Sequence, residues 1–140
     1  MINITIICVG ELKDKFYFDA AKEYEKRLSA FCTLKTIETT DEKLSSFISP
    51  KAYKIALCVE GKGLSSEEFA EKIDTAMTNG KSEIQLIIGG FDGLDEKIKA
   101  MCDFRLSFSK MTFPHRLMRV ILLEQIYRAF TIIHNMNYHH

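Results

Sequence analysis

The sequence lacks a net charge, because its 19 lysines and arginines balance its 19 aspartates and glutamates. This excludes a protein held on nucleic acid by bulk charge alone, since that mode needs a large excess of bases. Long apolar runs are missing too, for the longest has only a few residues, far below the roughly 20 that span a membrane. The chain also opens without the basic segment and cleavage site of a secretory signal. We expect a soluble, cytoplasmic protein with no membrane partner.

Close cysteine pairs are also absent from the sequence. The four cysteines, at positions 8, 32, 58 and 102, form no CxxC motif and have no histidine at a metal-ligand spacing. Cys8 and Cys58 fall in apolar, strand-like runs, where a thiol behaves as a small hydrophobic side chain. The pattern disfavours a disulfide framework and a zinc site, so we expect no metal and a reducing compartment.

What the sequence does contain suits one globular domain spanning residues 1–140, with ordinary fractions of hydrophobic (46%) and charged (27%) residues. Apolar, β-branched runs predict strands at 2–9, 34–40, 54–60, 83–88 and 104–108. Helical stripes, caps and glycine stops predict helices at 14–31, 65–80, 95–102 and 115–135, with a short connection at 41–50. Strands that alternate with helices predict an α/β fold with a mainly parallel sheet.

The last quarter of the chain differs from the rest in charge. Residues 105–140 hold five bases against one acid, a net of +4, so residues 1–104 carry −4. All four histidines lie in this quarter as well. We therefore expect any chemistry that faces an anion to lie there.

The predicted helix at 115–135 is apolar almost all round, apart from a narrow polar stripe that includes Glu124 and Arg128. One face of a sheet cannot cover so wide an apolar surface, and a small domain has few other elements to do so. We infer a homodimer that packs through this helix. A helix central within a monomer is the weaker alternative.

Two glycine groups follow predicted strands, where open α/β sheets bind ligands. Gly61-Lys62-Gly63 reads as a simple turn that ends the third strand, whereas Gly89-Gly90 exceeds what a turn needs and favours close approach of a ligand. Neither group completes a Rossmann GxGxxG fingerprint, and no P-loop motif is present. A further stretch, residues 106–119, gathers hydroxyls, cations and apolar side chains between a strand and a helix, as a ligand-binding loop does.

Several segments resemble the RlmH (YbeA) family of small SPOUT-class methyltransferases. The most specific are LIIGGFDGL (86–94), LSFSKMTFPHRLMRV (106–120), LLEQIYRAF (122–130) and the terminal YH (138–139). IICVGELKDKF (6–16), AKEYEKRL (21–28) and GKGLSSEEFA (61–70) also match. The sequence departs from the family in a shorter segment around 41–50 and in a tail, residues 135–140, that ends in two histidines.

The resemblance implies an α/β SPOUT-type parallel sheet with a C-terminal trefoil knot, an obligate homodimer and S-adenosyl-L-methionine as methyl donor. The implied reaction methylates N3 of a pseudouridine in helix 69 of 23S rRNA on the assembled ribosome. The family's donor contacts fall on the following positions: Leu57, Gly89, Phe108, Ser109, Lys110, Met111, Thr112 and Phe113. Because N3 carries a proton, the reaction also needs a base or cations that favour the anion.

Five residues are candidates for that second task. His139 is the candidate base, Tyr138 a partner for the flipped base, and His115 a ligand-loop side chain that could instead cap its helix. Arg119 and Arg128 are candidate contacts to phosphate or to a pseudouridine oxygen, although Arg128 could equally pair with Glu124 four residues earlier. The main alternative is a catalytically inactive dimeric module that binds the ribosome or RNA. A third reading, a Rossmann-type nucleotide enzyme, predicts a glycine fingerprint after the first strand, which the residues after Gly10 do not provide.

Overall fold

The computed structural model describes residues 1–138, and within them strands and helices alternate as predicted. The strands are β1 (Asn3–Val9), β2 (Thr33–Thr39), β3 (Tyr53–Gly63), β4 (Glu83–Ile88) and β5 (Phe104–Ser107). The α-helices are α1 (Lys15–Leu28), α2 (Ser66–Thr78), α3 (Glu96–Ala100) and α4 (His115–Ile133), and a short 3-10 helix, η1, spans Leu44–Phe47.

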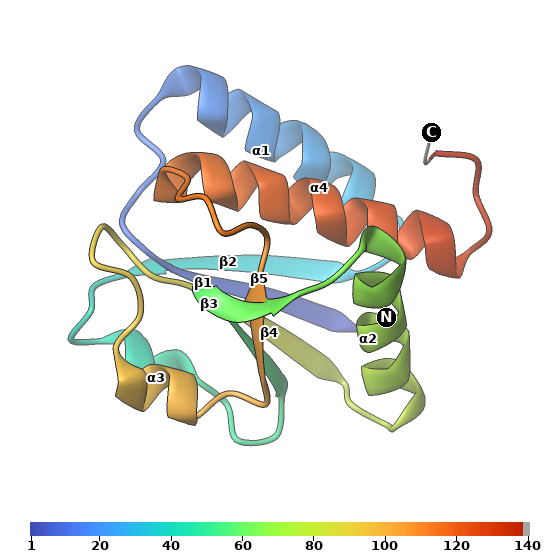
Figure 1. Ribbon diagram of the computed structural model, residues 1–140. Helices are drawn as coiled ribbons and strands as arrows, with labels where there is room; N and C mark the ends of the chain where they lie inside the picture. Colours follow the sequence, from blue (N-terminus) through green and yellow to red (C-terminus); the bar gives the residue numbers. More distant parts are fainter. Residues whose placement is uncertain (139–140) are drawn as a thin grey trace.

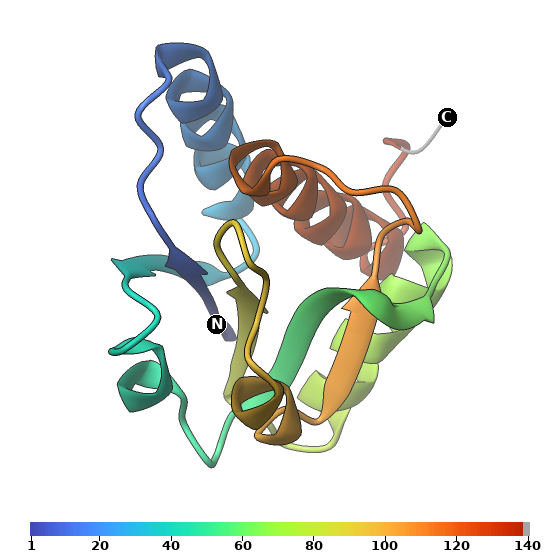
Figure 2. The same cartoon turned by 60° about the vertical axis from the view of Figure 1, so that its left-hand side comes forward.

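The strands form one parallel sheet in the order β2-β1-β4-β3-β5, which confirms the predicted α/β fold. Helices α1, α2 and α4 lie over one face, and η1 and α3 lie against the other (Figures 1 and 2). Residues in β1 alternate between two cores, so Ile6 packs under the large helices whereas Ile7 packs toward η1 and α3. The sheet therefore has both faces covered, as parallel sheets require.

The predicted start of α2 is confirmed by a complete capping box. The Ser65 hydroxyl accepts a hydrogen bond from the Glu68 backbone N–H at 3.0 Å, and the Glu68 carboxylate accepts one from the Ser65 backbone N–H at 2.8 Å. This cap fixes where the chain leaves the carboxyl edge of β3 and turns into α2.

Strand β3 corrects the prediction that Gly61-Lys62-Gly63 forms a terminating turn. The strand continues to Gly63, with a shift in its pairing to β5 between Leu57 and Lys62. A Cβ at Gly61 would lie 2.8 Å from backbone atoms of Arg105 and Leu106. Glycine is therefore required here because β5 passes too close for any side chain.

Helix α4 lies between α1 and α2, which cover its flanks, and every one of its residues is at least half-buried in a single chain. Its outward strip, at Leu117, Val120 and Ile121, is only partly covered. The homodimer and the trefoil knot stay predictions. Among residues 1–138, no helix is long and apolar enough to cross a membrane.

Candidate functional site

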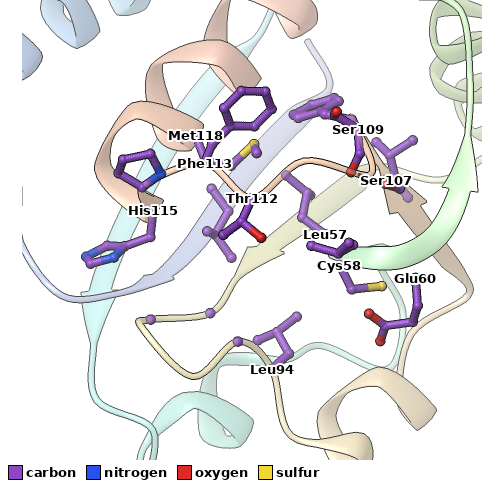
Figure 3. Close-up of a pocket in the computed structure, with 18 of the residues that line it drawn as sticks. Leu57, Cys58, Glu60, Leu94, Ser107, Ser109, Thr112, Phe113, His115 and Met118 are labelled. Atoms are coloured by element: carbon purple, nitrogen blue, oxygen red, sulfur yellow. Dashed lines mark hydrogen bonds between the residues drawn. The ribbon is translucent and has the colours of Figure 1, made fainter.

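A cavity of about 640 Å³ opens where the carboxyl ends of β3, β4 and β5 meet, at the edge of the sheet where α/β folds bind ligands. Its floor is formed by Leu57, where the pairing of β3 with β4 ends, by Ile88 at the end of β4 and by Leu106 in β5. The 89–94 loop and the 108–114 loop form its walls, and His115 and Met118 in the first turn of α4 close one side (Figure 3). The sequence-predicted ligand loop is therefore part of a real cavity.

The 89–94 loop is a tight turn in which Gly93 donates its N–H to the Gly90 carbonyl at 3.0 Å. A Cβ at Gly89 would lie only 2.4 Å from the Gly93 carbonyl carbon, and one at Gly90 would lie 3.0 Å from Val9. The chain's own backbone thus accounts for Gly89, and the Val9 side chain leaves little space at Gly90. Gly89 and Gly90 also line the cavity, so close approach of a ligand to them stays a prediction.

The 108–114 loop is shaped by the hydroxyls that the sequence places in it. The Ser107 hydroxyl donates to the Ser109 carbonyl at 2.9 Å, and the Met111 backbone N–H donates to the Ser109 hydroxyl at 3.0 Å. Pro114 then starts α4. These bonds curl the loop at the edge of the cavity, which Thr112 and Phe113 help to line (Figure 3).

The predicted donor contacts converge on this cavity with one exception. Its lining includes Leu57, Gly89, Phe108, Ser109, Met111, Thr112 and Phe113. Lys110 is exposed and is not part of that lining. Among the predicted catalytic residues, His115 also lines the cavity.

Sequence reasoning missed one wall, formed by Cys58 and Glu60 at the end of β3 and by Lys99 in α3. Lys99 forms an ion pair with Glu60 and thereby lowers the pKa of that carboxyl. Burial raises the pKa of the Cys58 thiol, which therefore stays protonated near neutral pH. The signal available in the sequence was position alone, because Cys58 and Glu60 lie in the last residues of the third predicted strand, 54–60.

The two predicted catalytic arginines, Arg119 and Arg128, do not line this cavity. The Arg119 side chain is only 6% exposed, and its guanidinium pairs with the Glu38 carboxylate at 2.6 Å and donates to the Gly10 carbonyl at 3.2 Å. Arg128 pairs with Glu124 at 3.0 Å, which is the alternative its spacing had left open. In a single chain, both guanidinium groups are occupied by carboxylates.

The tail turns back along α4 instead of entering the cavity. The Tyr138 hydroxyl lies 3.1 Å from one Glu124 carboxylate oxygen and 3.3 Å from the other. Burial, followed by the Glu124 charge, raises the pKa of Tyr138, so its hydroxyl is protonated and donates. The predicted base, His139, lies outside the described residues. Within residues 1–138, no group of three or more His, Cys, Asp or Glu side chains is arranged to hold a metal ion.

Comparison with known proteins decides the family. Residues 2–139 match the model of a family described as predicted SPOUT methyltransferase. The chain belongs to this family. It is 47% identical to Ribosomal RNA large subunit methyltransferase H of Bifidobacterium adolescentis and 48% identical to the protein of that name from Clostridium novyi, over 99% of both chains in each case. It is also 45% identical to a putative protein of that name from Methanococcus maripaludis, again over 99% of both chains. These matches confirm the resemblance seen in the sequence motifs.

The fold also resembles a solved structure, that of a probable methylase family protein from Haemophilus influenzae. The TM-score is 0.59 at 15% identity, and the similarity covers 99% of this chain and 70% of the other. At that identity the likeness supports the fold alone, which agrees with the parallel sheet described above.

Proposed function

We propose that this protein is an S-adenosyl-L-methionine-dependent methyltransferase of 23S rRNA that acts as a cytoplasmic homodimer. The observation that carries the proposal is the cavity at the carboxyl ends of β3, β4 and β5, in a chain of the SPOUT family whose relatives are named as methyltransferases of large-subunit ribosomal RNA. The acceptor that we propose is N3 of a pseudouridine in helix 69, the family's position 1915, on the assembled ribosome.

The cavity suits S-adenosyl-L-methionine in size and chemistry. Its volume of about 640 Å³ falls within the roughly 300–1,000 Å³ of small-molecule sites. Leu57, Phe108 and Phe113 offer apolar surface for an adenine ring, and the curled backbone around Thr112 offers polar groups for its edge and for the ribose. The bound donor would supply an already activated methyl group on its sulfonium.

The remaining task of the protein is to bring N3 into line with that methyl group and to accept the N3 proton. His115 is the described imidazole at the cavity wall, and His139 is the proposed base. Tyr138 is proposed to stack on or hydrogen-bond the flipped base. Because the chain has no net charge, its affinity for loose RNA is expected to be weak, so recognition should require folded ribosomal architecture.

We propose that two chains together complete each active site, with the tail of one chain serving the cavity of the other. In a single chain the tail is held away from the cavity, because Tyr138 is bound to Glu124, which lies six residues after Met118 at the cavity wall, or about 9 Å along α4.

Mass spectrometry of 23S rRNA from cells that lack this protein tests the proposed function. We expect one pseudouridine of helix 69 to lose a single methyl group, and a plasmid copy of the gene to restore it. Fully methylated rRNA in the deletion strain would contradict the proposal. Calorimetry with S-adenosyl-L-methionine distinguishes the inactive ribosome-binding module, which predicts no saturable heat.

A further inference from the structure

The strongest unexplained feature of the molecule is a polar cluster on the outer side of α4, far from the cavity. It consists of Glu124, Arg128 and Tyr138. The Glu124 carboxylate accepts from the Arg128 guanidinium at 3.0 Å and from the Tyr138 hydroxyl at 3.1 Å. The Arg128 guanidinium also lies over the Tyr138 ring, 5.1 Å from its centroid. All three groups are therefore bound to one another.

The same ring is held from a second side. Tyr127 meets Tyr138 edge-on, with ring centroids 4.8 Å apart and an interplanar angle of 83°. Edge-to-face aromatic pairs and cation–π contacts each favour one orientation of the ring over others. Together with the bond to Glu124, they define both the position and the tilt of Tyr138.

The backbone before Tyr138 is also fixed, because α4 ends in a Schellman motif. Asn135 adopts a left-handed conformation, with φ of 55°, and donates its N–H to the Ile132 carbonyl at 3.1 Å. Met136 donates its N–H to the Thr131 carbonyl at 2.8 Å. This turn reverses the chain after α4 and directs the tail back to the cluster (Figure 1).

A frayed terminus would need none of these devices. The Glu124 side chain is only 21% exposed and the Arg128 side chain 23% exposed, so their charges are partly removed from water. Such groups are costly unless each is paired and hydrogen-bonded. Here the pairing is completed by the tyrosine of the tail.

We infer that Glu124 is a positioning residue, which anchors the tail through the Tyr138 hydroxyl and thereby sets the orientation in which the Tyr138 ring meets the acceptor base. The inference rests on the proposed function, because it assumes that the tail takes part in methyl transfer. Arg128 contributes by holding the Glu124 carboxylate in place and does not itself contact substrate. This assigns a role to the Arg128–Glu124 pair other than stabilising the helix alone.

The test compares four variants of the full-length dimer: Glu124→Ala, Glu124→Gln, Tyr138→Phe and the double change Glu124→Ala with Tyr138→Phe. Asp19→Ala is the matched control, since it removes an ion pair of the same spacing, with Lys15, on α1. For each variant, the kcat of methyl transfer to ribosomes and the Kd for S-adenosyl-L-methionine are measured. A parallel assay follows the rate at which carboxypeptidase releases Tyr138.

We expect Glu124→Ala and Tyr138→Phe each to lower kcat about ten-fold, and the double variant to be no slower than either, because all three lose the same bond. The Kd for the donor should stay within two-fold, and the amide of Glu124→Gln should restore most of kcat because it still accepts the hydrogen bond. Carboxypeptidase should release Tyr138 about ten-fold faster from Glu124→Ala, with Asp19→Ala unchanged in all assays.

The inference would be overturned if the losses of kcat in the two single variants multiplied in the double variant. It would also be overturned if carboxypeptidase released Tyr138 from Glu124→Ala at the wild-type rate. A parallel loss of thermal stability and of donor binding in Glu124→Gln would assign the pair to the fold instead. Failure of the proposed function has a different signature: the wild-type protein would bind donor but methylate nothing, while the release assay would still report whether Glu124 anchors the tail.

Discussion

The two ends of α4 are built in opposite ways. At its first turn the helix meets an open cavity that is lined by loop backbone, apolar side chains and the Glu60–Lys99 pair, with His115 at the edge. Along its later turns, charged and aromatic side chains are fully engaged with one another around Tyr138. The first end leaves room for a ligand, whereas the second immobilises a segment of the chain itself.

Under the proposed function, neither end is a complete active site by itself. The cavity is lined by ionisable groups such as Glu60, Lys99 and His115 besides its apolar side chains, whereas the tail carries Tyr138 and, in its sequence, two histidines. We propose that each active site combines the cavity of one chain with the tail of its partner. Changes confined to one end should therefore have separate effects.

Gly89→Ala should destroy the cavity end while leaving the tail end intact. The new Cβ would lie 2.4 Å from the Gly93 backbone, so the 89–94 loop must move. We expect donor affinity to fall by at least about 100-fold, because the displaced loop no longer forms the wall. Calorimetry measures this. Gly63→Ala is the control, since a Cβ there meets nothing within 4 Å; equal binding by the two variants would show that the loop does not matter.

Removing residues 138–140 should impair methyl transfer and leave donor binding intact. The cavity lies at the other end of α4, so donor affinity should stay within about two-fold while methyl transfer to ribosomes falls about 100-fold, a typical effect of losing a general base. Single-turnover kinetics with labelled donor give the rate. Wild-type turnover by the shortened chain would remove the tail from the mechanism.

Arg119→Met should change stability far more than activity. It removes a buried partner of Glu38, whose own side chain is 39% exposed and can regain water. We expect the free energy of unfolding to fall by about 2 kcal/mol, with kcat within about three-fold of wild type. Urea titrations measure the free energy of unfolding. The control is Arg105→Met, which breaks an exposed ion pair with Glu96. A large loss of kcat without loss of stability would instead place Arg119 at the substrate.

Cys58 offers the mildest probe, because its thiol lines the cavity. Burial raises its pKa, so less thiolate is present at pH 8 than in a free cysteine, and alkylation should accelerate as the pH rises above 9. Saturating S-adenosyl-L-methionine should slow labelling of Cys58 about ten-fold and leave the buried Cys32, whose pKa is raised to about 11, unaffected. Mass spectrometry of labelled peptides reports each site, and unprotected Cys58 would argue that the donor binds elsewhere.

Local patterns predicted most of this structure. Apolar, β-branched runs located all five strands. The tendency of α/β sheets to bind ligands at the carboxyl ends of their strands located the ligand loop. The i, i+4 spacing anticipated the pair of Glu124 and Arg128. Long-range geometry could not be read in the same way: the Arg119–Glu38 pair joins residues 81 positions apart, and the need for Gly89 arises only once Gly93 has folded back on it. The reversal at Asn135 likewise depends on a backbone conformation that the tail's composition does not reveal.

The most direct test of the central claim is a mixed dimer. One chain carries Gly89→Ala and an intact tail, the other has an intact cavity but lacks residues 138–140, and the pair is coexpressed with two different tags and purified through both. Either parent dimer should be inactive. If each site combines a cavity with the tail of the partner, the mixed dimer has one complete site of two and should show about half of the wild-type rate of methyl transfer. A mixed dimer no more active than its parents would contradict the claim that two chains build the site.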